Sequence, residues 1–466
     1  MLFNSIEFIL FFPVVTLLYY LTPHKFRWIQ LLIASCVFYA AFIPSYIFIL
    51  FFLILIDYVA GIKIEKTRHK KRWLLISIIA NIGLLAFFKY FNFFIENANS
   101  LTGSHLILLH IALPIGLSFH TFQSISYTIE VYRGNQKAIK HLGYYSLYVM
   151  FYPQLVAGPI ERPYHLFPQL FAAHKFSSQN LYEGLRLMAW GFFKKTVIAD
   201  RLSGYVDTVF NSHQDYTAAN IWIAVFFFSI QIYADFSGYS DIATGAARCM
   251  GFDLMINFNR PYESKNIREF WRKWHISLST WFRDYVYIPL GGNRHGVFKK
   301  RISLLLTFIL SGLWHGAGWT FVAWGFLHGL FLIIYDLFST QFQTTKIARP
   351  LSLLITFFCT GFAWIFFRAA SIDTALSMIA HAANPATITL SGITALKSSE
   401  FRYGNFSFLI IFLSIIYMLV LERFTNPLLT NLNNKKIADV VFFAATVIGI
   451  IFLGIFHKTS FIYFQF

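Results

Sequence analysis

The sequence contains few charged side chains, and few of these are acidic. Charged residues make up only 13% of the chain, whereas hydrophobic residues make up 57% and aromatic residues 20%. A soluble domain carries about 25% charged residues, so the composition excludes an ordinary soluble enzyme. We therefore expect an all-α, polytopic integral membrane protein.

Cysteine is scarce as well. Cys36, Cys249 and Cys359 lie far apart, each in an apolar setting. Because they form no CxxC pair and no metal-ligand spacing, we expect small core side chains, no metal site and no bound cofactor. The chain also lacks low-complexity tracts, internal repeats and long linkers, so we expect a single domain over residues 1–466.

Apolar runs recur along the whole chain. Since a span needs about 20 mainly apolar residues, we expect about eleven to thirteen transmembrane helices. The candidate spans cover residues 5–21, 29–43, 45–62, 73–95, 105–132, 181–200, 219–249, 302–320, 321–338, 350–368, 404–421 and 438–456. Segments 143–160 and 270–292 contain Pro153, Pro159 and Pro289 among scattered charges. We expect both to be re-entrant or interfacial segments that line a cavity.

Lysine and arginine gather in alternate loops. Loops 24–27, 63–72 and 133–140 are basic, whereas loops 43–45 and 96–105 contain neither residue. Basic loops stay in the cytoplasm, so we expect a retained first span and extracytoplasmic termini at both ends. The net charge of +17 is then explained by these loops and by anionic membrane lipid. We expect no nucleic-acid partner.

Two histidines lie where water should be scarce. His315 occurs in the apolar run RISLLLTFILSGLWHGAGWTFVAWGFLHG, and His275 in EFWRKWHISLSTWFRDYVYIPLGGN. An ionisable residue at bilayer depth costs about 3 kcal/mol or more without a partner or a water-filled cavity, so each is a candidate functional residue. Either can instead pack in the core and hydrogen-bond a carbonyl, and charged neighbours could make His275 an interfacial anchor. We expect His328 to be structural.

Three long runs of sequence resemble one family. They are FYPQLVAGPIERP at 151–163, the tryptophan-rich block from DFSGYSD to LGGNRHG at 235–296, and SGLWHGAGWTFVAWGFLHG at 311–329. Together they resemble the membrane-bound O-acyltransferase family, and within it the bacterial alginate O-acetylases, peptidoglycan O-acetyltransferases and teichoic acid D-alanyl transfer proteins. The resemblance implies one such domain over the whole chain, with helices and re-entrant segments around a central catalytic tunnel and a core at residues 105–340.

The resemblance implies acyl transfer from a thioester to a hydroxyl, with His315 of the WHG motif as the essential residue. An attacking hydroxyl must lose its proton, and a neutral imidazole near pH 7 is well matched to accept it. Burial keeps the ring neutral. His275 matches a position where relatives carry a second polar residue, which could orient the thioester carbonyl or the acceptor. The residues expected to bind substrate are Arg272, Trp274, Trp314 and Asp284.

Other polar residues have weaker claims to direct function. Asp235 and Asp241 lie at the end of an apolar run, and we expect them to pair with Arg248 or Arg268 in a buried network. We expect Glu161, in the motif AGPIERP, to help shape the rim of the cavity.

The last residues, FIYFQF, fit an FxYxxF pattern that occurs at the end of such transferases or on a small partner in the teichoic acid system. The resemblance implies that Tyr463, in a relay tail over residues 458–466, carries the acyl group transiently. A phenol ester is a good acyl donor. The same residues could instead form an interfacial aromatic belt.

These features predict an O-acetyltransferase of the bacterial cytoplasmic (inner) membrane. The expected donor is acetyl-CoA, and the final acceptor is a cell-envelope polysaccharide such as alginate or peptidoglycan. The family implies a separate extracytoplasmic SGNH or esterase-like transferase as partner. One alternative is D-alanyl transfer from a carrier-protein thioester to teichoic acid. Another is a transporter whose histidines relay protons, although the sequence lacks the half-repeats that a transporter would predict.

Overall fold

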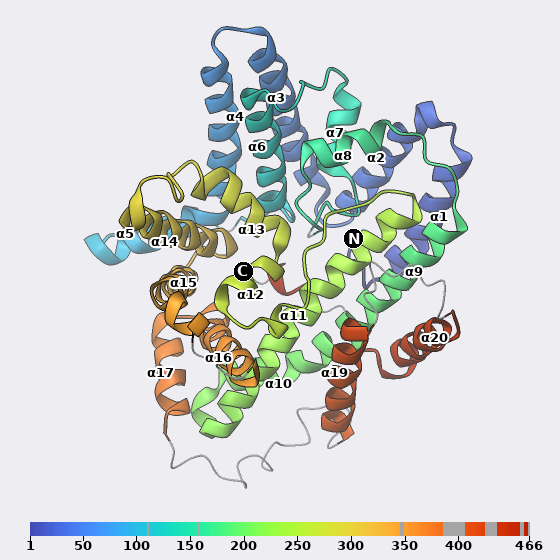
Figure 1. The fold of residues 1–466 in the computed structure, drawn as a ribbon. Helices are drawn as coiled ribbons and strands as arrows, with labels where there is room; N and C mark the ends of the chain where they lie inside the picture. The colour runs from blue at the N-terminus through green and yellow to red at the C-terminus, as the bar shows by residue number, and fades with distance from the viewer. Residues whose placement is uncertain are drawn as a thin grey trace. The chain divides into compact units, whose positions relative to one another are not determined.

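The regular structure is helical throughout the described part of the chain. The computed structural model describes residues 1–109, 111–156, 158–344, 349–384, 406–424, 436–456 and 461–464. Figure 1 shows helices joined by irregular segments. The chain divides into two compact units, the first made of Met1–Met188 and Ser240–Ile256, the second of Ala189–Tyr239 and Asn257–Phe466. The single domain and the central tunnel stay predictions.

The first unit contains the N-terminal helices. They are α1 (Ile6–Leu21), α2 (His24–Ala40), α3 (Ile47–Lys66), α4 (Lys70–Leu85), α5 (Phe91–Thr102), α6 (Leu117–Arg133), α7 (Leu142–Met150) and α8 (Pro163–Phe171), followed by α9 (Ser178–Phe192), which ends in the second unit. Helices α3, α4 and α6 pack against one another (Figure 1). Their interface buries Asp57, which accepts hydrogen bonds from Ser77 at 2.6 Å and from Asn81 at 2.9 Å. This carboxylate is therefore satisfied within the helix group.

The second unit contains the elements that position the candidate site. They are the π-helix η3 (Phe193–Ala199), α10 (Asp200–Asn211), α11 (Ala218–Cys249), α12 (Ile267–Lys273), α13 (Ile276–Phe282), the π-helix η6 (Arg283–Tyr287), α14 (Gly296–His315), α15 (Trp319–Thr344), α16 (Arg349–Arg368), α17 (Ile372–Ala382), α19 (Phe406–Phe424), α20 (Lys436–Leu453) and the short η9 (Ile462–Phe464). Only the last turns of α11, from Ser240, belong to the first unit.

The polytopic, all-α prediction is confirmed. Five helices of the described chain are long and apolar enough to cross a membrane, and two further apolar helices are shorter. The long ones are Pro44–Lys66, Lys70–Thr102, Ala218–Cys249, Trp319–Phe338 and Arg349–Arg368, and the shorter ones are Ile6–Leu21 and Val440–Leu453. The total of eleven to thirteen spans stays a prediction.

One predicted span begins later than expected. The sequence predicts a helix from residue 105, but α6 begins at Leu117. Pro114 cannot donate a backbone hydrogen bond, and Gly116 adopts a left-handed conformation with φ of 79°. A Cβ at Gly116 would lie 2.7 Å from the carbonyl oxygen of Leu155. The chain therefore turns sharply before the helix can begin.

Both segments predicted to be irregular are interrupted helices. Helix α7 ends at Met150 and α8 begins at Pro163, and the described residues between them, 151–156 and 158–162, form no regular helix. Between residues 267 and 287 the chain forms only α12, α13 and η6, of seven, seven and five residues. Their re-entrant placement in a membrane stays a prediction.

Helices α14 and α15 lie side by side with their backbones in close contact (Figure 1). A Cβ at Gly312 would collide with the carbonyl oxygen of Phe321, and one at Gly325 with the carbonyl oxygen of Phe308. Small residues at helix interfaces allow such close packing in membrane proteins. This contact fixes the C-terminal end of α14, where His315 lies.

Candidate active site

His315 is the last residue of α14. The chain leaves the helix at Gly316, where a Cβ would collide with the ring of Phe321. Only glycine therefore allows α15 to pack this close to the end of α14. The His315 side chain remains only 4% exposed, so the turn holds the imidazole inside the protein.

His275 lies between α12 and α13 in a left-handed backbone conformation, with φ of 42° and ψ of 56°. This conformation is uncommon for a residue with a Cβ and costs about 1–2 kcal/mol. Asn257, which precedes α12, stabilises it. Its carbonyl accepts a hydrogen bond from Ile276 N at 2.9 Å, and its side-chain oxygen accepts one from Ser277 Oγ at 2.6 Å. Strained residues cluster at active sites, and His275 is fully buried.

Tyr463 lies in η9, which the residues before it hold in place. The backbone N–H of Ile462 donates to Asp235 Oδ2 at 2.8 Å. The ring of Phe461 packs against Tyr239, with centroids 4.6 Å apart, and against Phe236 at 5.5 Å. Both ring partners and the carboxylate come from α11, so this helix fixes the position of the tail.

The three predicted catalytic residues lie together. The ring centroids of His315 and Tyr463 are 5.3 Å apart, and the His275 ring lies 6.4 Å from each of them. Phe236 packs against His275 at 4.5 Å and against Tyr463 at 4.6 Å. Distant segments of the sequence thus form one cluster of rings, which we call the histidine–tyrosine cluster (His275, His315 and Tyr463).

The Tyr463 hydroxyl oxygen is buried, and the described residues offer it no hydrogen-bond partner. Buried polar groups are nearly always paired, and leaving one unpaired costs about 1–3 kcal/mol. A phenol in this position, close to an imidazole, is a candidate to donate its proton when a substrate binds.

Aromatic side chains form the walls around His315. Trp314 lies 4.8 Å from the imidazole, Trp324 5.1 Å and Phe367 5.4 Å, centroid to centroid. Trp314 also contacts His275 at 6.2 Å. Apolar walls of this kind keep water from a buried imidazole, which strengthens electrostatic interactions beside it.

Burial sets the protonation states of two groups outside the candidate spans. Desolvation lowers the pKa of His275 to about 3, so its imidazole is neutral near pH 7. Desolvation also raises the pKa of Tyr463 well above its usual value, so the phenol keeps its proton until a base takes it. The cluster therefore contains a neutral imidazole and a protonated phenol.

Of the four predicted substrate-binding residues, only Trp314 lies in this group of rings. Trp274 packs among other aromatic side chains, 5.1 Å from Phe258 and 5.2 Å from Trp364. Arg272 is exposed, and Asp284 pairs with the adjacent Arg283 at 2.7 Å. Substrate binding by these four residues stays a prediction.

The expected ion pairs of Asp235 are wrong. Asp235 Oδ1 pairs with Lys195 Nζ at 2.8 Å, instead of with Arg248 or Arg268. Arg268 pairs with Asp336 at 2.7 Å. Sequence distance gave no guide to these partners, because the pairing depends on how η3 packs against α11.

His328 lies among aromatic side chains, and a purely structural role for it stays a prediction. Its Nδ1 accepts a hydrogen bond from Trp271 Nε1 at 3.3 Å, and its ring packs against Trp324 at 4.9 Å.

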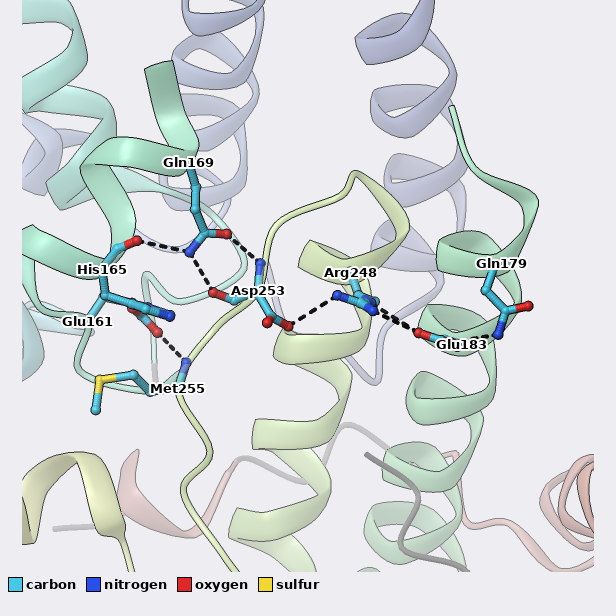
Figure 2. Close-up of polar contacts among 8 residues, drawn as sticks. All are labelled: Glu161, His165, Gln169, Gln179, Glu183, Arg248, Asp253 and Met255. Carbon is cyan, nitrogen blue, oxygen red and sulfur yellow. Dashed lines mark hydrogen bonds and ion pairs between the residues drawn. The ribbon is translucent and has the colours of Figure 1, made fainter. Parts of the chain in front are cut away.

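Glu161 belongs to a separate polar group in the first unit (Figure 2). It is fully buried, and its two carboxylate oxygens accept from Met255 N at 2.5 Å and contact His165 Nδ1 at 2.6 Å. Burial raises the pKa of Glu161, and the hydrogen bond to Glu161 raises the pKa of His165. Gln169 adds two hydrogen bonds to the backbone of Asp253, at 2.7 and 2.9 Å. Together they attach the chain after α11 to α8.

Arg248 extends this polar group to α9 (Figure 2). It donates to Glu183 at 2.9 Å and to Asp253 at 3.3 Å, and Gln179 donates to Glu183 at 2.6 Å. We call this set of hydrogen-bonded residues the Glu161 network; its members are Glu161, His165, Gln169, Gln179, Glu183, Arg248, Asp253 and Met255. A role for Glu161 in shaping a cavity rim stays a prediction.

No group of three or more His, Cys, Asp or Glu side chains could hold a metal ion within the described ranges. Three residues that support the cluster were not predicted from the sequence, namely Asn257, Lys195 and Phe236. Lys195 carried a usable signal, because a lysine within an apolar segment requires a partner. The sequence gives no comparable signal for Asn257 and Phe236, because their contacts depend on the fold.

The sequence profile of the membrane-bound O-acyltransferase family matches residues 135–372. A probable alginate O-acetylase of Pseudomonas aeruginosa is 38% identical over 439 residues, which cover 92% of this chain and 84% of that protein. A peptidoglycan O-acetyltransferase of Helicobacter pylori is 37% identical, with 81% of this chain and 79% of that protein covered. A teichoic acid D-alanyltransferase of Bacillus subtilis is 29% identical and covers 53% of this chain and 67% of that protein.

Proposed function

Because the chain belongs to the membrane-bound O-acyltransferase family, we propose that it transfers acetyl groups from acetyl-CoA for the O-acetylation of an extracytoplasmic cell-envelope polysaccharide. Membership makes the chain a multi-pass membrane O-acyltransferase. The transporter alternative is therefore excluded. Similarity to O-acetylases over most of the chain supports acetyl as the acyl group. An alginate-like polymer and peptidoglycan are both candidate acceptors.

The buried phenol of Tyr463 beside His315 carries the proposal. Its hydroxyl lacks a hydrogen-bond partner among the described residues, and the His315 ring lies 5.3 Å from the Tyr463 ring. This arrangement supports Tyr463 as the first acceptor of the acetyl group, with His315 as the general base.

In the first step His315 takes the phenolic proton as the Tyr463 oxygen attacks the thioester carbonyl carbon. The new C–O bond forms, the C–S bond breaks, and the proton passes from His315 to the departing CoA thiolate. His275 orients the thioester carbonyl while it stays neutral. The products are free CoA and O-acetyl-Tyr463, and the aromatic walls around His315 keep water from hydrolysing the ester.

In the second step a hydroxyl of the partner attacks the Tyr463 ester and restores the phenol. An extracytoplasmic SGNH or esterase-like transferase is the proposed partner, and the polysaccharide is its acceptor. The alternation of basic loops supports extracytoplasmic termini. This orientation would bring Tyr463 to the side where the partner acts.

The D-alanyl alternative shares the same site and differs only in the donor. The D-alanyltransferase of Bacillus subtilis matches about half of this chain, whereas the O-acetylase of Pseudomonas aeruginosa matches 92%. This difference favours acetyl transfer. Thioester consumption only with an aminoacylated carrier protein would favour the alternative.

The test uses the full-length protein in nanodiscs with radiolabelled acetyl-CoA. We compare wild type, His315→Ala and Tyr463→Phe for CoA release and for label on the protein. We expect label on the wild type alone, with CoA release reduced about 10²–10⁴-fold in His315→Ala. CoA release that does not depend on His315 would overturn the proposed mechanism.

A further inference from the structure

Three buried charged side chains, Lys195, Asp200 and Asp235, form a group that contacts the tail at Ile462. Lys195 Nζ is 2.8 Å from Asp235 Oδ1 and 2.9 Å from Asp200 Oδ1. The side chains of Lys195 and Asp235 are each only 4% exposed. A buried charge is costly unless an opposite charge lies beside it, and Lys195 supplies that opposite charge to Asp235.

The second oxygen of Asp235 is directed to the tail. Oδ2 accepts the hydrogen bond from Ile462 N at 2.8 Å. A hydrogen bond from a backbone N–H to an ionised carboxylate is roughly twice as strong as a neutral one. Because Ile462 immediately precedes Tyr463, this contact fixes the peptide plane from which the Tyr463 side chain extends.

The same region also holds the end of α20. Lys195 lies in η3, a π-helix, and such elements are rare and occur frequently at functional sites. The carbonyl of Thr196, the next residue, accepts from Ile455 N at 3.0 Å. Arg201 hydrogen-bonds the carbonyl oxygen of Leu453. The residues around η3 thus anchor the described chain on both sides of residues 457–460.

We propose that Asp235, held by Lys195, is a positioning residue that fixes Tyr463 at His315 and His275, an inference that rests on the proposed acyl relay. The carboxylate touches neither substrate nor reacting atoms. It acts through the backbone of Ile462. Since a displacement of about 1 Å at a reacting group can reduce a rate about 100-fold, one hydrogen bond beside Tyr463 is enough to control the transfer.

Positioning and simple structural support predict different fates of the acetyl group. If Asp235 positions the tail, its loss displaces the Tyr463 phenol and lets water reach the place that the phenol occupied beside His315. CoA is then still released, but acetate forms instead of O-acetyl-Tyr463. If Asp235 only supports the fold, CoA release and Tyr463 labelling decrease together and their ratio stays constant. The fraction of released CoA that yields O-acetyl-Tyr463 is therefore the decisive quantity.

The first experiment measures this fraction in full-length Asp235→Ala, Asp235→Asn and a control. Glu422→Gln is the matched control, because Glu422 is also a buried carboxylate and accepts from the Tyr233 hydroxyl at 2.8 Å. We expect the fraction to decrease about 10- to 100-fold in Asp235→Ala, less in Asp235→Asn, which keeps an acceptor oxygen, and not in Glu422→Gln. The KM for acetyl-CoA should not change. An unchanged fraction in Asp235→Ala would overturn the proposal.

The second experiment measures the tail itself and does not depend on the acyl relay. Ile462 is only 2% exposed, so a cysteine in Ile462→Cys should react slowly with a maleimide, as mapped by peptide mass spectrometry. Adding Asp235→Ala should speed this reaction at least about tenfold, because the hydrogen bond that holds Ile462 N is lost. Adding Glu422→Gln should not. Equal protection in Ile462→Cys with and without Asp235→Ala would contradict the positioning role.

The label on Tyr463 and the maleimide protection of Ile462→Cys together distinguish a failure of the acyl relay from a failure of the positioning role. Wild-type protein that consumes acetyl-CoA without acetylating Tyr463 would remove the relay, and with it the catalytic meaning of the positioning role. Label on wild-type Tyr463, together with an unchanged fraction and unchanged maleimide protection in Asp235→Ala, would keep the relay and remove the role of Asp235.

Discussion

The Glu161 network and the histidine–tyrosine cluster each contain a buried polar group, the Glu161 carboxylate and the Tyr463 hydroxyl, but the two groups are bonded differently. In the Glu161 network both carboxylate oxygens of Glu161 are bonded, to Met255 N and to His165. In the histidine–tyrosine cluster the Tyr463 hydroxyl lacks a partner within the described residues. A satisfied network stabilises a fold, whereas an unsatisfied buried hydroxyl has a bond left for a substrate. On this difference we base the proposal that the Glu161 network supports the fold and that the histidine–tyrosine cluster carries the chemistry.

The largest expected effect is on the rate of acetyl-CoA consumption when a residue of the histidine–tyrosine cluster is replaced. His315→Ala should reduce acetyl-CoA consumption about 10²–10⁴-fold, because the general base is lost, while the protein keeps its thermal stability within a few degrees. Initial rates in nanodiscs and thermal melts of the same samples check both. A stable His315→Ala protein with wild-type turnover would remove the distinction between the two groups.

Asn257→Ala should have an intermediate effect on turnover. The substitution removes the side-chain oxygen that accepts from Ser277 Oγ, so the left-handed backbone at His275 loses support. We expect a decrease in kcat of about tenfold, of the size that a small displacement of a catalytic group produces. Asn257→Asp keeps an acceptor oxygen and should recover most of the activity. Equal losses in both variants would argue against this role.

Glu161→Ala should affect stability instead of chemistry. The substitution removes the fully buried carboxylate together with its two bonds, to the part-buried Met255 N and His165, which costs about 3 kcal/mol. Glu183→Ala is the control, because its pair with Arg248 is about one-third exposed and should cost less than about 1 kcal/mol. Urea or thermal unfolding measures both. A Glu161→Ala protein of normal stability but without turnover would move Glu161 into the catalytic machinery.

The smallest expected effect is a pH dependence of stability from His275. Its pKa in the folded protein, about 3, lies below the unfolded value of about 6.5, so the unfolded state binds more protons between these values. Stability should therefore be lost as pH falls below about 6.5, by about 2 kcal/mol at pH 5. His275→Asn should lack this component. Parallel pH profiles of the wild type and His275→Asn would contradict the burial argument.

The sequence predicted the parts of the site that lie in local motifs. His315, His275 and Tyr463 each occur in a recognisable run, and the structure places their rings together. The partner of Asp235 could not be predicted, because it depends on the packing of η3 against α11. The late beginning of α6 shows the same limit in the fold: hydrophobicity suggested a span from residue 105, whereas Pro114 and the left-handed Gly116 turn the chain first.

The central claim is that Tyr463 receives the acetyl group and passes it on. The most direct test is a rapid-quench time course with isotope-labelled acetyl-CoA, the wild-type protein and its extracytoplasmic partner, followed by peptide mass spectrometry of the tail. Our account predicts that O-acetyl-Tyr463 appears before the polymer is acetylated and decays at the rate of polymer acetylation. Polymer acetylation at full rate with no acetyl group on Tyr463 would contradict it.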